Sequence, residues 1–121
     1  MVPNANATDY FYHDMTGENA TRAQSLLKGH SAASFTASEV TVAGWRFVPS
    51  TYVYTNNDKA MAVNFQEAMA KRAQNQDVPE GGVKAFDGPL GEVYIDVGHC
   101  ALVMDRAEEF SKVIRSVVGA T

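Results

Sequence analysis

Two apolar segments of the chain each run into a polar turn and then into a helical pattern, and this repeat constrains the fold most. The first segment is TYVYT at residues 51–55, and all five of its residues are β-branched or aromatic, as strands prefer. The turn-forming residues Asn56, Asn57 and Asp58 follow, and apolar residues then return at helical spacing over 62–76. Because both faces of the segment are apolar, it is typical of a parallel strand covered by helices on each side.

The second segment repeats this organisation near the end of the chain. EVYIDV at 92–97 is a short apolar strand that leads through a glycine to His99 and then to another helical pattern. Together the two units predict an α/β fold with two parallel strands, near 51–55 and 92–96, and flanking helices. The carboxyl ends of parallel strands meet at one edge of a sheet, where sites commonly form. We therefore expect Asp58 and His99 to lie at the same edge.

These segments resemble the closing part of the α/β-hydrolase fold family. That family places the acid of its catalytic triad after one strand and the histidine after a later one. GWRFVPSTYVYTNNDKAM, FQEAMAKRAQ and GHCALVMDRAEEF are similar to the acid segment, the following helix and the histidine segment of one branch, the single-domain esterases with their hydroxynitrile-lyase and methylesterase relatives. The resemblance covers roughly residues 8–119. It implies that His99 is the base that shuttles the nucleophile's proton and that Asp58 orients it.

Two other aspartates compete with Asp58 as the partner of His99. Asp96 is closer to the histidine in sequence, but it lies within the expected strand, where the two-residue alternation points it to one face. Asp87 lies in a loop rich in glycine and proline, and it stays open as an alternative. Cys100 stands where the resembled branch often has serine, and we expect it to be a buried, inert thiol.

The nucleophile of such a triad is not evident upstream of Asp58. GHSAA at 29–33 is similar to the core of the G-x-S-x-G elbow, but that motif needs a strand before it and a helix after it. Residues 21–28 have a helical pattern and no β-branched run, so we interpret Gly29 as a helix stop and do not assign Ser31 as the nucleophile. An acid and a base without a nucleophile cannot transfer an acyl group.

The chain is expected to form one partial α/β-hydrolase domain over residues 1–121. By the resemblance, residues 1–44 form a lid-like helical region, and residues 45–121 form the strand–helix–strand–helix unit that carries the acid and histidine positions. In the last helix, Asp105 and Glu108 predict a capping box. The same helix has an apolar stripe that we expect to be buried, made of Ala107, Phe110, Val113, Ile114, Val117 and Val118.

The composition restricts the classes of function. With 45% hydrophobic and 20% charged residues, the chain is expected to fold rather than to stay disordered. A net charge of −4 without a basic run argues against a binder of nucleic acid or of acidic membranes. The single cysteine excludes an internal disulfide and a cysteine-clustered zinc site, and no cofactor is expected. The sequence lacks an apolar run of about 18 residues and a signal-peptide pattern, so we expect a cytoplasmic protein.

Two classes of function follow from these observations. The first is the carboxy-terminal part of a serine hydrolase that acts on carboxylic esters or related bonds and is inactive alone. Its partner would be a small ester-like substrate, once an amino-terminal half completes the site. The second is a non-catalytic binding or assembly module of the same fold. In either case two parallel strands leave at least one sheet edge unpaired, so self-association is also expected.

Overall fold

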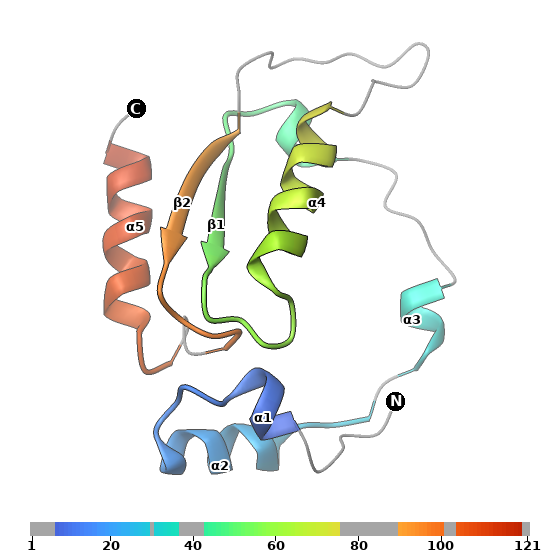
Figure 1. The fold of residues 1–121 in the computed structure, drawn as a ribbon, viewed down its shortest axis with the longest axis vertical. Helices are drawn as coiled ribbons and strands as arrows, with labels where there is room; N and C mark the ends of the chain where they lie inside the picture. The colour runs from blue at the N-terminus through green and yellow to red at the C-terminus, as the bar shows by residue number, and fades with distance from the viewer. Residues whose placement is uncertain (1–6, 30, 37–42, 76–89, 101–103, 120–121) are drawn as a thin grey trace.

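A computed structural model describes residues 7–29, 31–36, 43–75, 90–100 and 104–119 of the protein. Within these residues the helices and strands follow one another as α1 (Ala7–Phe11), α2 (Gly17–Leu26), α3 (Ala33–Thr36), the 3₁₀ helix η1 (Gly44–Arg46), β1 (Thr51–Thr55), α4 (Val63–Asn75), β2 (Gly91–Ile95) and α5 (Ala107–Gly119) (Figure 1). Helices and strands are therefore mixed, as the sequence predicts.

The sheet formed by the described residues consists of β1 and β2, which run parallel. Their register pairs Thr51 with Gly91 at one end and Thr55 with Ile95 at the other. Gly91 is suited to this register because a Cβ atom there would lie 2.7 Å from Oγ1 of Thr51. The prediction of two parallel strands joined through a helix is confirmed, with the second strand starting one residue earlier than the sequence indicates.

Helices α4 and α5 cover opposite faces of this sheet. Tyr52 lines a pocket together with Met69 of α4, whereas its neighbour Val53 lines a groove together with Phe110 of α5. Successive side chains of a strand point to opposite faces, so the two helices lie on different sides. In Figure 1, α4 lies beside β1 and α5 beside β2, while α1 and α2 lie beyond the carboxyl ends of both strands.

The hydrophobic core sits at this carboxyl end and joins the amino-terminal helices to the end of β2. Its buried members are Ala7, Tyr12, Met15, Ala20, Ile95 and Val97. Val97 is fully buried, and Tyr12 of the amino-terminal segment is 8% exposed. Burying such side chains contributes on the order of 1.5–3 kcal/mol each. The core therefore fixes α1 and α2 against the loop that follows β2, which is the loop that carries His99.

The predicted burial of the apolar stripe on α5 is wrong. Phe110 and Val113 pack against the core as partly buried residues, but Ile114 is 47% exposed and Val118 is 67% exposed. The stripe lines a groove of about 240 Å³ between α5 and β1. The helical periodicity identifies the apolar face correctly, but the two-stranded sheet is too narrow to cover all of it.

The predicted capping box of α5 also does not form. The Asp105 carboxylate instead accepts hydrogen bonds from the backbone N–H of Thr16 and from Nδ2 of Asn19. These bonds lower the pKa of Asp105 below its ordinary value. Glu108 forms an ion pair with Lys112, one helical turn further along, at 3.3 Å. Asp105 thus ties the start of α2 to the segment just before α5.

Candidate functional site

The turn after β1 encloses the carboxylate of Asp58. Oδ1 of Asp58 accepts hydrogen bonds from the backbone N–H groups of Ala60 and Met61, both at 2.8 Å. Oδ2 accepts a hydrogen bond from Oγ1 of Thr55 at 2.9 Å. The side chain of Asp58 is only 4% exposed, so these local donors replace the water that a carboxylate would otherwise bind.

The electrostatics of this turn favour the ionised form of Asp58. Burial alone raises the pKa of a carboxyl group, and here it is the largest single effect. Hydrogen bonds from Met61, His99 and Thr55 outweigh it together, and they hold the pKa of Asp58 below its ordinary value. Asp58 is therefore a carboxylate near neutral pH, and it can only accept hydrogen bonds.

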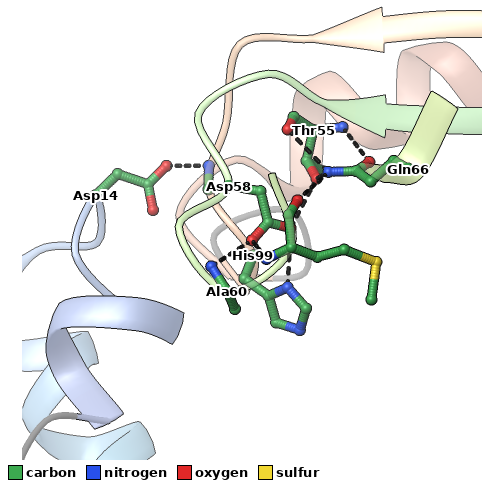
Figure 2. A network of polar contacts seen from close by, with 8 residues as sticks. Asp14, Thr55, Asp58, Ala60, Gln66 and His99 are labelled. Atoms are coloured by element: carbon green, nitrogen blue, oxygen red, sulfur yellow. Dashed lines mark hydrogen bonds and ion pairs between the residues drawn. The ribbon is translucent and has the colours of Figure 1, made fainter. Parts of the chain in front are cut away.

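His99 follows β2 and meets this carboxylate. Its Nδ1 atom lies 2.9 Å from Oδ2 of Asp58, and its side chain is 34% exposed (Figure 2). A neutral imidazole carries one proton, and a bond to an ionised carboxylate places that proton on Nδ1. Nε2 is then left with a free lone pair. The pair thus presents one basic nitrogen from a partly exposed ring held by a buried acid.

Gln66 of α4 is a buried polar residue that fixes the end of β1, and the sequence analysis did not identify it. Its side-chain amide accepts a hydrogen bond from Thr55 N–H at 3.0 Å and donates to the carbonyl oxygen of Thr55 at 3.2 Å. It also donates to Oγ1 of Thr55 at 2.9 Å and to the carbonyl of Met61 at 2.7 Å. Gln66 is 2% exposed. A glutamine at a core-facing position of an amphipathic helix was the available signal.

The competing aspartates do not occupy the position of Asp58. Asp96 is exposed, and its Oδ1 atom accepts a hydrogen bond from Nδ2 of Asn56 at 2.7 Å. Asp87 lies outside the described residues. Cys100 is half-buried, and burial followed by the negative charges of Asp58 and Asp14 raises the pKa of its thiol. That thiol is protonated near neutral pH, as is typical of an inert cysteine.

Ser31 lies in a different part of the fold. It precedes the short helix α3, where its Oγ atom accepts a hydrogen bond from Ala33 N–H at 3.2 Å. No described strand precedes it, so the strand–turn–helix context of a nucleophile elbow is not met. In Figure 1, α3 is well separated from the loops after β1 and β2. The structure therefore does not bring Ser31 to Asp58 and His99.

The amino-terminal segment borders the histidine loop. The Asp14 carboxylate accepts a hydrogen bond from Gly98 N–H, and the carbonyl of Phe11 accepts one from Cys100 N–H at 3.2 Å. The ring of Phe11 meets the imidazole of His99 edge-on, with ring centroids 5.2 Å apart. His99 thus contacts the turn after β1 through Asp58 and the amino-terminal segment through Phe11.

Comparison with protein-family models, with curated proteins and with solved structures gave no match for the chain. Among the described residues, no group of three or more histidine, cysteine, aspartate and glutamate side chains could hold a metal ion. No helix in the described part of the chain has the length and apolarity needed to cross a membrane. The contact between Asp58 and His99 is the feature of the described residues from which a function can be inferred.

Proposed function

We propose that the chain is the carboxy-terminal part of a serine hydrolase of the α/β-hydrolase type, which acts on carboxylic esters or related bonds. The observation that carries this proposal is the 2.9 Å contact between Nδ1 of His99 and the buried carboxylate of Asp58. In an acid–histidine pair of this kind the carboxylate sets the tautomer and orientation of the imidazole. The order of the two residues along the chain also agrees with that family, in which the acid precedes the histidine.

In the proposed reaction, Nε2 of His99 accepts the hydroxyl proton of a serine as the serine oxygen attacks the ester carbonyl. The imidazolium then donates this proton to the leaving alcohol as the carbon–oxygen bond of the ester breaks. In the second half, water attacks the acyl-enzyme and the same nitrogen takes and returns a proton. The ionised Asp58 stabilises the imidazolium in both halves, and its lowered pKa keeps it from taking the proton itself.

The nucleophile and the oxyanion-hole donors belong, in this proposal, to a polypeptide segment outside these 121 residues. Among the described residues, the hydrogen bond made by the ring of His99 is the one to Asp58. Oxyanion-hole donors would have to lie near the serine, because they stabilise the tetrahedral intermediate formed on it. We therefore expect the chain by itself to have an incomplete site.

A complementation assay tests this function. The chain is combined with the amino-terminal half of a single-domain esterase that carries its own G-x-S-x-G serine, and hydrolysis of p-nitrophenyl acetate is followed. We expect hydrolysis and fluorophosphonate labelling of that serine only in the mixture, with loss of hydrolysis for His99→Ala and Asp58→Asn. Asp96→Asn is the matched control, because Asp96 is an exposed aspartate that bonds Asn56 instead. Labelling of the chain alone at Ser31 would contradict the proposal.

The alternative, a non-catalytic binding or assembly module, is favoured by one observation. The groove between α5 and β1 is lined by apolar side chains, among them the exposed Ile114. Exposed apolar patches mark interaction sites on many soluble proteins. If the complemented chain binds its partner tightly and still shows no hydrolysis that depends on His99, the binding module is the better description.

A further inference from the structure

The turn that carries His99 is held on both sides of the histidine by the amino-terminal segment. Gly98 N–H donates to Oδ2 of Asp14, and Cys100 N–H donates to the carbonyl of Phe11. Asp14 and Gly98 are 84 positions apart in the chain, so the contact is purely tertiary. Figure 2 shows Asp14 reaching this backbone nitrogen from the amino-terminal segment while Asp58 reaches the imidazole from the turn after β1.

Close packing at Gly98 makes the contact specific. A Cβ atom at Gly98 would lie 2.7 Å from Cε1 of His13 and would also overlap Oδ1 of Asp14. Real Cβ atoms do not make such approaches, so glycine at position 98 lets the side chains of His13 and Asp14 reach the backbone of the turn. The close approach of His13 and Asp14 therefore explains why the residue before His99 is glycine, which the strand-to-turn pattern alone does not explain.

The carboxylate of Asp14 is directed at this single backbone donor. Its other oxygen, Oδ1, is buried and has no hydrogen-bond partner among the described residues. A hydrogen bond from a backbone N–H to an ionised carboxylate is stronger than one between neutral groups. Asp105, which follows the histidine turn in the chain, forms a second link to the amino-terminal segment, because its carboxylate accepts hydrogen bonds from Thr16 N–H and from Nδ2 of Asn19.

We propose that Asp14 is a positioning residue for His99. By holding Gly98 N–H it fixes the backbone just before the histidine, so that Nδ1 of His99 meets Oδ2 of Asp58. The edge-on contact of Phe11 with the imidazole restricts the ring itself. The importance of this arrangement for catalysis rests on the proposed function, but the effect on the geometry of His99 does not.

The test follows the imidazole of His99 by NMR in the full chain labelled with ¹⁵N-histidine. The chain has three histidines, so His30→Gln and His99→Gln assign the signals, and those that remain belong to His13. We expect the wild type to show His99 with its proton on Nδ1. Asp14→Leu removes the acceptor at similar size, and we expect its His99 to become a mixture of tautomers. Asp14→Asn keeps an acceptor oxygen and should restore the wild-type signals, while the exposed Asp9→Asn is a control without effect.

Gly98→Ala provides an independent variant in case Asp14→Leu does not fold. It removes no polar group but pushes the turn away from Asp14, and it should disturb His99 in the same way. Wild-type His99 signals in a folded Asp14→Leu or Gly98→Ala chain would overturn the proposal.

The complemented enzyme separates this inference from the proposed function. There, Asp14→Leu should lower kcat by about tenfold to a hundredfold, as displaced catalytic groups do, with KM little changed. Disturbed His99 signals without any hydrolysis by the wild-type complex would leave the positioning role intact and remove the hydrolase function. Hydrolysis that Asp14→Leu leaves unchanged would remove the positioning role alone.

Discussion

Nδ1 of His99 lies 2.9 Å from Oδ2 of Asp58, although the two residues are 41 positions apart and follow different strands. The register of the sheet produces this contact, because Thr55 and Ile95 are paired and both strands end there. Pairing continues briefly past the strands, since Asn57 N–H donates to the carbonyl of Val97 at 3.2 Å. The two turns therefore start from the same edge of the sheet, and Asp58 and His99 each lie a few residues beyond the end of their strand.

Asp58→Asn should lower the stability of the chain more near neutral pH than in acid. The pKa of Asp58 is lowered in the folded state, so its ionisation stabilises the fold above the ordinary value of 3.8. This contribution disappears as the pH falls through the folded-state pKa. The side-chain amide of the variant can also place an N–H group opposite the Nδ1–H group of His99, so that two donors face each other. Disrupting a hydrogen bond of this kind costs about 1–3 kcal/mol.

Urea unfolding of the wild type and Asp58→Asn between pH 7 and pH 3 measures this difference. We expect the gap in the free energy of unfolding to narrow steadily below about pH 4. Asp96→Asn serves as the control, since Asp96 is exposed and bonds only the neighbouring Asn56 among described side chains. A gap that stays constant over this range would show that the charge of Asp58 does not stabilise the fold.

Gln66→Leu should destabilise the end of β1. The substitution keeps the size of the side chain but leaves the backbone N–H of the buried Thr55 without the partner that Gln66 supplies. The Thr55 carbonyl loses the hydrogen bond from Gln66 and keeps the one from Asp58 N–H. Each buried polar group left unpaired costs about 1–3 kcal/mol. Gln74→Leu, at an exposed position of the same helix, controls for the change in helix composition. Equal midpoints of urea unfolding for the two variants would contradict the role of Gln66.

Tyr54 should remain protonated until the chain unfolds in alkali. Its side chain is fully buried, and burial together with the hydrogen bond to Glu92 at 2.7 Å raises its pKa. A raised pKa means that the neutral phenol stabilises the fold below about pH 10, and that this stability is lost as the pH rises further. In an ultraviolet titration, the phenolate absorbance of the wild type should therefore exceed that of Tyr54→Phe only at and above the pH of unfolding. Excess phenolate absorbance in the wild type while its circular dichroism is still native would contradict the prediction.

The parts of this structure that the sequence predicts are those set by local patterns. Alternating apolar segments and turns predict parallel strands, and the shared edge of parallel strands predicts that Asp58 and His99 approach each other. The contact of Asp14 with Gly98 has no such local signal, because it joins residues 84 positions apart. The exposure of Ile114 was missed for a related reason: periodicity identifies an apolar face but not what covers it.

Among the described residues, the outer edge of β1 has no partner strand and offers backbone groups for further pairing. The carbonyl of Ser50 accepts a hydrogen bond from a backbone N–H of β2, and Asn56 N–H donates to a backbone carbonyl of β2. Because the direction of the backbone groups alternates along a strand, residues 51, 53 and 55 direct their N–H and carbonyl groups away from β2. At Thr55, the N–H and the carbonyl form hydrogen bonds with the side chain of Gln66. The N–H and carbonyl groups of Thr51 and Val53 also point outward from the sheet. Thr51 and Val53 also line the apolar groove beside α5. An edge strand next to an apolar groove favours association with another chain.

The chain alone should therefore self-associate, with the groove as part of the contact. Burying a side chain such as Ile114 contributes on the order of 1.5–3 kcal/mol, so Ile114→Lys should weaken association at least about tenfold. Val48→Lys is the matched control, because Val48 is also exposed but does not line the groove. Sedimentation velocity over a range of concentrations measures the effect. A wild-type chain that sediments as a concentration-independent monomer and melts in one sharp transition would show that its fold is complete without a partner.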